Sequence, residues 1–281
     1  MRETTAFAGD AAIAARLDFA RYLARSVGRE ANLFRNTAEP AALGVSAKGL
    51  QDFVTIADRR AEETIKAELS RAFPEDGFLG EETGGEPTQA GFWVVDPIDG
   101  TANYIRGLRH WGVSIAYVLD GQVRVGCIFD AASGNVYSAS LGGGAFCESR
   151  PVRVSDRSDP TEALAIVGYS RRTSFDVYQS MLRDLYDIGI EYRRLGSAAI
   201  GLVRVADGIA DLYVEAHLNS WDVLAGVLIA GEAGARVTMP PLSRMLAAGG
   251  AVAACAPGMA PHLGGLLRGL THDGSVTAQS A

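Results

Sequence analysis

Apolar residues recur at helical spacing in two stretches near the start of the chain. From Asp10 to about Phe34 they are Ile13, Leu17, Ala20, Leu23 and Val27. From Ile56 to about Phe73 they are Ala61, Ile65 and Leu69. Both stretches predict amphipathic helices, because these positions share one helical face. Asp10 is the expected N-cap of the first helix, and Thr55 with Asp58 the expected capping box of the second.

Strand patterns dominate the middle of the chain. Residues 39–51 indicate a loop or hairpin with Lys48 exposed, and a short strand should contain Phe78 and Leu79. The apolar run 92–95 stops at Asp96. Residues 111–137 alternate around an Asp-Gly pair at 120–121, and glycines 142–144 indicate a further hairpin.

Strand and helix signals alternate in the second half of the chain. A strand is expected at 163–168 and helices at 175–186 and 221–232. This alternation predicts an α/β fold with layered sheets and helices. The polar stretch 149–159 suggests a boundary, so we expect an N-terminal α+β domain at 1–150 and a C-terminal α/β domain at 151–270. Residues 271–281 are small and polar, which indicates a flexible tail.

Composition excludes several classes of protein. The chain has 281 residues, 48% of them hydrophobic, with 33 acidic against 26 basic residues and a net charge of −7. The sequence has no stretch that collects Lys and Arg, so we do not expect it to bind a nucleic acid polymer. The sequence contains no apolar stretch of about 20 residues, so no membrane span is expected, and no signal peptide is evident. Three scattered cysteines fit a reducing compartment, so a cytoplasmic protein is expected.

The strongest chemical signal is the segment Asp96-Pro-Ile-Asp99-Gly-Thr101. A buried strand delivers two carboxylates, and the Gly-Thr turn can present backbone N–H groups to an anion. The pattern lacks the ligand spacing of a calcium EF-hand. Its two aspartates are three residues apart, whereas haloacid-dehalogenase-like phosphatases place them two apart. An ordinary polar turn remains an alternative for this segment taken alone.

Two further acidic segments are ambiguous by themselves. Glu81 and Glu82 follow a short strand, where a solvated loop would also explain them. Asp222 should lie in the first turn of an apolar helix capped by Ser220, where an acidic residue can simply complement the helix dipole.

The order of the segments is more specific than any one of them. DFVTIAD, GEE, DPIDGTAN and WDVLAG together resemble the inositol monophosphatase family over roughly residues 10–268. Gly196-Ser-Ala-Ala199 and Glu215 match further positions of that family. The resemblance implies a layered αβαβα sandwich and hydrolysis of a small phosphate monoester with two to three Mg²⁺ ions.

The resemblance also assigns roles to residues. It implies metal ligation by Glu81, Asp96, the carbonyl of Ile98, Asp99 and Asp222, with Asp58 supporting a weaker third ion through water. Glu81 and Thr101 would orient and deprotonate the attacking water, without a covalent phosphoenzyme. The substrate would contact Gly100, Thr101, Gly196, Ser197, Ala198, Glu215 and Asp222.

The identity of the substrate is left open by the sequence. A carboxylate at Glu215 suits a polyol such as inositol, whose monophosphate is the first candidate. Four nearby arginines could instead bind a second phosphate: Arg171, Arg172, Arg193 and Arg194. The alternatives are histidinol phosphate, fructose 1,6-bisphosphate, 3′-phosphoadenosine 5′-phosphate, or a non-catalytic relative that binds a partner. The family further implies a homodimer and sensitivity to lithium.

Overall fold

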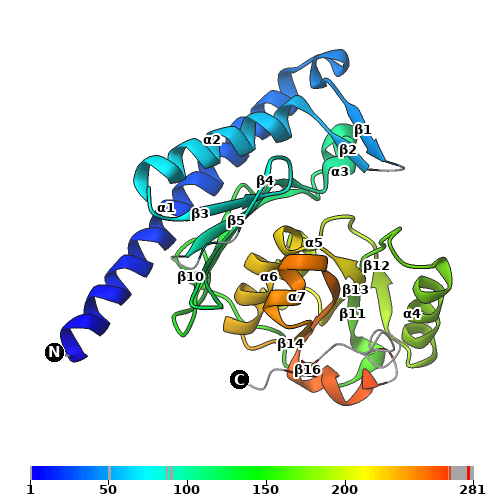
Figure 1. Ribbon diagram of the computed structural model, residues 1–281. Helices are drawn as coiled ribbons and strands as arrows, with labels where there is room; N and C mark the ends of the chain where they lie inside the picture. The colour runs from blue at the N-terminus through cyan, green and yellow to red at the C-terminus, as the bar shows by residue number, and fades with distance from the viewer. Residues whose placement is uncertain are drawn as a thin grey trace.

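The protein folds into five alternating layers of helix and sheet. The computed structural model describes residues 2–49, 52–86, 88, 91–264, 266 and 277–278. Three apolar cores separate the layers: a helix pair against a large sheet, helices between the two sheets, and helices behind the second sheet. The arrangement (Figure 1) confirms the predicted layered α/β sandwich.

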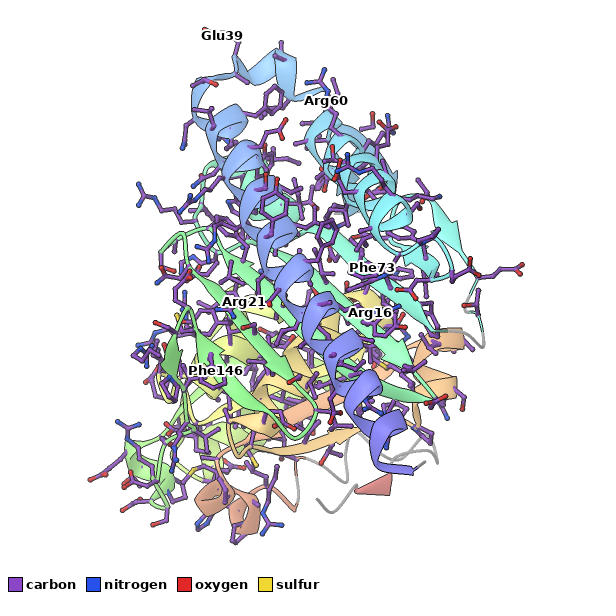
Figure 2. The ribbon with its side chains drawn as sticks, turned by 90° about the vertical axis from the view of Figure 1, so that its left-hand side faces the viewer. Arg16, Arg21, Glu39, Arg60, Phe73 and Phe146 are labelled. Carbon is purple, nitrogen blue, oxygen red and sulfur yellow. The ribbon has the colours of Figure 1, made fainter. Side chains whose placement is uncertain are left out.

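The first outer layer consists of α1 (Arg2–Thr37) and α2 (Ile56–Ala72). The two helices lie across the face of the large sheet, with Arg16 of α1 stacked 4.7 Å over the ring of Phe73 (Figure 2). The predicted N-cap Asp10 is wrong, because α1 already begins at Arg2. A helix can extend beyond its apolar stripe wherever its backbone hydrogen bonds continue.

The start of α2 follows the prediction in detail. The Thr55 hydroxyl accepts a hydrogen bond from the Ala57 N–H at 3.1 Å, and the Thr55 N–H donates to Asp58 at 2.8 Å. This reciprocal capping box satisfies backbone groups that a helix end leaves unpaired. Before α2, a 3₁₀ turn at Pro40–Leu43 and the hairpin β1 (Ser46–Gly49) and β2 (Asp52–Val54) occupy the predicted loop or hairpin. The side chain of Lys48 lies outside the described part of the chain.

The large sheet has the strand order β10-β9-β8-β7-β6-β5-β3-β4. Only β3 and β5 run parallel to each other, and the other neighbours are antiparallel. Its strands are β3 (Gly77–Gly80), β4 (Gly84–Gly85), β5 (Phe92–Asp99), β6 (Gly112–Leu119), β7 (Gln122–Asp130), β8 (Val136–Ser140), β9 (Gly144–Cys147) and β10 (Arg150–Pro151). The short helix α3 (Thr101–Arg106) follows β5. The predicted hairpins are confirmed, whereas the predicted strand end at Asp96 is wrong, since β5 continues to Asp99.

The second sheet has the order β12-β11-β13-β15-β14-β16. Its strands are β11 (Leu164–Val167), β12 (Glu191–Arg193), β13 (Leu212–Leu218), β14 (Arg236–Met239), β15 (Gly250–Cys255) and β16 (Thr277–Ala278). β12, β11 and β13 are parallel, and the remaining pairs are antiparallel. β16 lies inside the predicted tail and forms the edge of this sheet, where pairing with β14 through main-chain groups requires no apolar pattern.

Helices fill the space between the sheets and cover the second one. α5 (Ala198–Ala206), α6 (Ser220–Glu232) and α7 (Leu242–Ala248) contribute to the core between the sheets. α4 (Phe175–Asp187) and the 3₁₀ helix Pro257–His262 cover the outer face, and a 3₁₀ turn at Pro160–Glu162 precedes β11. The predicted cap Ser220 is wrong, because it is the first helical residue and Asn219 is the N-cap.

Two features bear on the organisation of the chain. In chain order, the large sheet ends with β10, which lies inside the predicted boundary stretch 149–159, and the second sheet begins after that stretch with β11. The division into two domains stays a prediction, since one core contains residues from both halves. Among the residues that the structure describes, no helix combines the length and apolarity needed to cross a bilayer.

Candidate active site

Three carboxylates from distant parts of the sequence converge at one end of the large sheet. Oxygen atoms of Glu81, Asp96 and Asp222 all lie within 4.8 Å of one another. β3 and β5 are adjacent and parallel, so Glu81, which follows β3, lies beside the end of β5. The start of α6 is held nearby, because the Ser114 hydroxyl of β6 donates a 3.1 Å hydrogen bond to the carbonyl of Trp221.

A bulge in β5 explains how Asp96 and Asp99 serve the same site. Residues three apart on a regular strand point to opposite faces of the sheet. Here Asp96 pairs with Ser114 and Asp99 with Gly112, so three steps along β5 oppose two steps along β6. One extra residue restores a common side for the two carboxylates. The Ile98 N–H donates to Asp96 at 2.9 Å and fixes the turn between them.

The electrostatics of this cluster fit a divalent cation. Burial raises the pKa of Asp96 well above its usual value, and the charges of Glu81, Asp99 and Asp222 raise it further. The pKa of Asp222 is raised by burial and by Glu81 and Asp99. Buried like charges destabilise one another unless protons or a cation neutralise them. Carboxylate oxygens are the ligands that Mg²⁺ prefers, so these residues could hold that ion.

Asp99 is oriented by the start of α5. Its Oδ2 accepts a hydrogen bond from the Ser197 hydroxyl at 2.6 Å and another from the Ala199 N–H at 2.6 Å. Burial raises the pKa of Asp99 to about 6, and these hydrogen bonds limit the rise. Asp99 is outside the group of three that shares a 4.8 Å separation, although its charge raises the pKa of both Asp96 and Asp222.

Thr101 connects the second helix to the segment that carries Asp96 and Asp99. Its hydroxyl lies 3.1 Å from Asp58 Oδ1 and 3.0 Å from the carbonyl of Ile98, both of which accept hydrogen bonds. The other oxygen of Asp58 accepts from Thr55 in the capping box. The capping contact and the expected site role of Asp58 are therefore compatible, since each uses a different oxygen. Burial raises the pKa of Asp58, and its hydrogen bonds oppose that rise.

Glu215 lies within the electrostatic reach of the same cluster. The Tyr213 hydroxyl donates to its Oε2 at 2.8 Å. Burial raises the pKa of Glu215 to about 7; the Tyr213 hydrogen bond lowers it, the charge of Asp99 raises it, and those of Arg194 and Arg172 lower it. Gly168 gives the carboxylate room, because an added Cβ would come within 1.7 Å of Oε2.

Two glycine turns bring the expected substrate contacts together. Gly100 and Gly196 both have positive φ, and a Cβ on Gly100 would come within 3.2 Å of the Gly196 carbonyl and of Ser197 Cβ. The Gly196–Ala198 turn therefore lies against the segment that follows β5. Asn103 joins them, because its Nδ2 donates to the carbonyl of Leu195 at 2.8 Å. Asn103 had no predicted role, and its place three residues after Gly100 in DPIDGTAN was the available signal.

A second residue without a predicted role is Glu62. It lies four residues after Asp58 on α2, is fully buried, and accepts hydrogen bonds from the N–H groups of Glu82 and Thr83. A glutamate beside Ala61 on the apolar stripe of a helix was the signal, because buried carboxylates are costly without partners.

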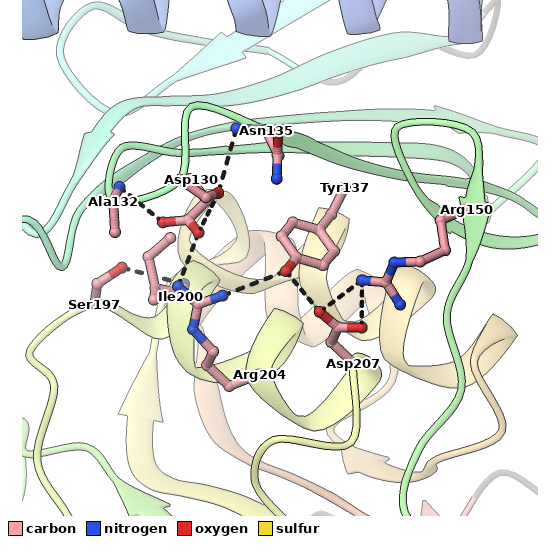
Figure 3. A network of polar contacts seen from close by, with 10 residues as sticks. Asp130, Ala132, Asn135, Tyr137, Arg150, Ser197, Ile200, Arg204 and Asp207 are labelled. Carbon is pink, nitrogen blue, oxygen red and sulfur yellow. Dashed lines mark hydrogen bonds and ion pairs between the residues drawn. The ribbon is translucent and has the colours of Figure 1, made fainter.

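The opposite end of α5 is fastened by a polar network (Figure 3). Arg204 forms a 2.8 Å ion pair with the fully buried Asp130 and donates a 3.3 Å hydrogen bond to the Tyr137 hydroxyl. Tyr137 donates to Asp207, which also pairs with Arg150 at 2.8 Å. These contacts join α5 to β7, β8 and β10, so the helix that orients Asp99 is fixed at both ends.

Comparison with known proteins identifies the family. The model of the inositol monophosphatase family matches residues 2–270. The chain belongs to the inositol monophosphatase family. Its members are phosphoric monoester hydrolases, so the resemblance in DPIDGTAN and WDVLAG is confirmed and the chain is assigned to that class of enzyme.

Similar proteins carry different names. "Nus factor SuhB" of Xylella fastidiosa is 40% identical over 220 residues, covering 76% of this chain and 78% of the relative. "Inositol-1-monophosphatase" of Rhizobium meliloti is 39% identical over 209 residues, covering 72% and 78%. Among solved structures, a Thermotoga maritima IMPase superimposes with a TM-score of 0.80 at 29% identity, covering 92% of this chain and 98% of that one.

Proposed function

We propose that this inositol monophosphatase family member hydrolyses the phosphate monoester of a small polyol with Mg²⁺, with inositol monophosphate as the first substrate to test. The observation that carries the proposal is the convergence of Glu81, Asp96 and Asp222 within 4.8 Å. The Thr101 hydroxyl lies 3.1 Å from Asp58, a distance suited to moving a proton, and it also contacts Ile98, in the segment that carries Asp96. Hard oxygen ligands favour Mg²⁺ over zinc.

The residues of the chain would supply orientation and proton transfer. Bound Mg²⁺ supplies neutralisation of phosphoryl charge and acidification of the attacking water. Thr101 can accept a hydrogen bond from that water while donating its own proton to Asp58, which fixes the direction of attack. Glu81 would take the proton of the water. No covalent phosphoenzyme is required. The N–H groups of Gly100 and Thr101 would donate hydrogen bonds to phosphate oxygens.

Glu215 and the Gly196–Ala198 turn, both from the C-terminal half, would recognise the hydroxyl groups of the polyol. Asp99 links these residues to the cluster, because Ser197 donates a hydrogen bond to its carboxylate and its charge raises the pKa of Glu215. With a pKa of about 7, Glu215 can accept a hydrogen bond as a carboxylate or donate one when protonated. Both forms suit a ligand whose hydroxyls donate and accept.

The test is phosphate release from inositol monophosphate with Mg²⁺ and with excess EDTA. Asp96→Asn should lower kcat/KM by more than 100-fold, and EDTA should abolish wild-type activity. Asp120→Asn is the matched control, because Asp120 is exposed in the β6–β7 turn, far along the strand from the cluster. Full activity of Asp96→Asn, or activity that survives EDTA, would contradict the metal assignment.

A second candidate substrate carries another anionic group. The positive charges of Arg172 and Arg194 reach Glu215, and Arg194 lies 5.9 Å over the ring of Tyr169. Arg193 instead pairs with Glu191 at 2.5 Å on the surface. A preference for fructose 1,6-bisphosphate or 3′-phosphoadenosine 5′-phosphate that is lost in Arg194→Gln, and kept in Arg193→Gln, would support this candidate.

A homodimer, a cytoplasmic location and inhibition by lithium are proposals that rest on the family resemblance. The first is tested by sedimentation, and the last by phosphate release in the presence of Li⁺. The SuhB relatives carry a name that denotes a Nus factor, which favours a partner-binding role as the alternative to catalysis. Wild type that releases no phosphate from any candidate substrate at saturating Mg²⁺ would favour that alternative.

A further inference from the structure

Glu62 makes a two-point contact with the turn that carries Glu81. Its Oε2 accepts a hydrogen bond from the Glu82 N–H at 2.9 Å, and its Oε1 accepts one from the Thr83 N–H at 2.7 Å. The side chain is fully buried. Each carboxylate oxygen therefore satisfies one backbone donor, and the helix α2 is joined to the segment between β3 and β4.

The backbone at Gly80 is shaped to admit this carboxylate. A Cβ at position 80 would come within 2.5 Å of Cδ and Oε2 of Glu62, closer than any real side chain could stay. Glu81 follows directly, and its own N–H donates to the Val95 carbonyl of β5 at 3.1 Å. Three consecutive backbone N–H groups around Glu81 are therefore hydrogen-bonded. The first, of Glu81 itself, bonds to β5, and the next two bond to Glu62.

α2 holds two parts of the site through one face. Asp58 and Glu62 are four residues apart, so their side chains project from the same side of the helix. Asp58 reaches the hydroxyl of Thr101, and Glu62 reaches the turn of Glu81. The two residues that would direct the attacking water therefore take their positions from a single rigid element.

We propose that Glu62 is a positioning residue, which aims the Glu81 carboxylate at Asp96 and Asp222 and thereby sets the affinity of the site for a divalent cation. The inference rests on the proposed metal site. A buried carboxylate costs free energy that an apolar side chain at the same position would not. Its two backbone contacts offset that cost, and both lie within two residues of Glu81.

The test measures cation binding by the purified protein, independently of catalysis. Glu62→Gln keeps the shape of the side chain but replaces one acceptor oxygen with an NH₂ group that faces a backbone N–H. Isothermal titration with Mg²⁺ alone should show a Kd raised about tenfold, the effect typical of lost partners of metal ligands. Activity should return toward the wild-type kcat at high Mg²⁺. Glu63→Gln is the matched control, because Glu63 is the exposed neighbour on α2.

Two further variants separate positioning from stability. Gly80→Ala adds a methyl group that would displace the Glu62 carboxylate. Like Glu62→Gln, it should raise the Kd for Mg²⁺. In a Glu81→Gln background, Glu62→Gln should change the Kd by less than twofold, because a residue that acts through Glu81 has nothing left to position. An equal effect of Glu62→Gln in both backgrounds would overturn the proposal.

The remaining outcomes distinguish this inference from the proposed function. If wild type binds Mg²⁺ and releases phosphate, while Glu62→Gln and Gly80→Ala keep the wild-type Kd, the positioning role is wrong and the enzyme assignment stands. If wild type binds no Mg²⁺, the metal site is wrong and the positioning role falls with it. Should Glu62→Gln fail to fold, the Kd of Gly80→Ala decides.

Discussion

The Ser197 hydroxyl lies 2.6 Å from Oδ2 of Asp99, across 98 residues of sequence. Ser197 is also the N-cap of α5, because its oxygen accepts the Ile200 N–H at 3.2 Å. One side chain therefore orients a carboxylate of the first half and starts a helix of the second half. Removal of this hydroxyl should therefore change both the stability of the fold and the pH dependence of catalysis.

Ser197→Ala should raise the pKa of Asp99, because the hydrogen bond favours the ionised form. The acid limb of the pH dependence of kcat/KM should move to higher pH. Loss of the cap should also lower the free energy of unfolding by about 1 kcal/mol. Urea unfolding and pH–rate profiles check the two effects. Ser174→Ala is the control, since Ser174 begins α4 without a described capping hydrogen bond; an equal change in both variants would contradict a special role for Ser197.

Thr101→Ala should lower kcat by about 10²–10³, within the range expected for lost proton-transfer groups. The affinity for Mg²⁺ should change less than kcat, because the Thr101 hydroxyl contacts Asp58 and the carbonyl of Ile98, neither of which is among the three clustered carboxylates. Steady-state kinetics and Mg²⁺ titration separate the two quantities. Thr101→Ser keeps the hydroxyl and should restore most of the activity. An inactive Thr101→Ser would point to packing rather than to the hydroxyl.

The stability of the metal-free protein should depend on pH through the acidic cluster. Burial raises the pKa of Asp99 to about 6 and, together with the charge of Asp99, that of Glu215 to about 7. Such groups bind protons more tightly in the folded chain than in the unfolded chain, where their pKa is about 4. Their contribution to stability is therefore present at low pH and lost as pH rises through about 6 to 7.

Thermal unfolding at pH 5 to 8 in EDTA and in Mg²⁺ checks this expectation. In EDTA the Tm of wild type should fall by several degrees relative to Asp222→Asn as pH rises, because the variant has one buried charge fewer. Mg²⁺ should remove the fall in wild type. Parallel pH dependence of the two proteins in EDTA would show that the cluster does not titrate as described.

Arg204→Met should lower the free energy of unfolding by about 3–5 kcal/mol, because it leaves Asp130 buried without its cation. Urea unfolding measures the loss. Arg193→Met is the control, since its partner Glu191 is exposed and such surface pairs contribute about 0–1 kcal/mol. A double variant, Asp130→Leu with Arg204→Met, should recover much of the loss. If Arg204→Met is as stable as wild type, the network of Figure 3 does not anchor α5.

Local patterns in the sequence were sufficient for most elements. The spacing of apolar residues gave the helix Ile56–Ala72 with its capping box, and the alternation at 111–137 gave β6, β7 and β8. Element ends were less predictable. The predicted caps Asp10 and Ser220 are wrong. Several residues near a helix start have side chains that can cap, and the backbone conformation, which the sequence alone does not specify, decides which of them is the N-cap.

The sequence by itself determined which carboxylates are candidates and, through the order of four motifs, the family to which the chain belongs. Only the tertiary structure decided which of them meet. Glu81, Asp96 and Asp222 come together because β3 pairs with β5 and α6 packs beneath the sheet, and the contact of Glu62 with the turn of Glu81 depends on the same packing. Periodicity states which face of an element is buried, whereas the partner of that face, and hence the burial that raises each pKa, follows from the fold as a whole.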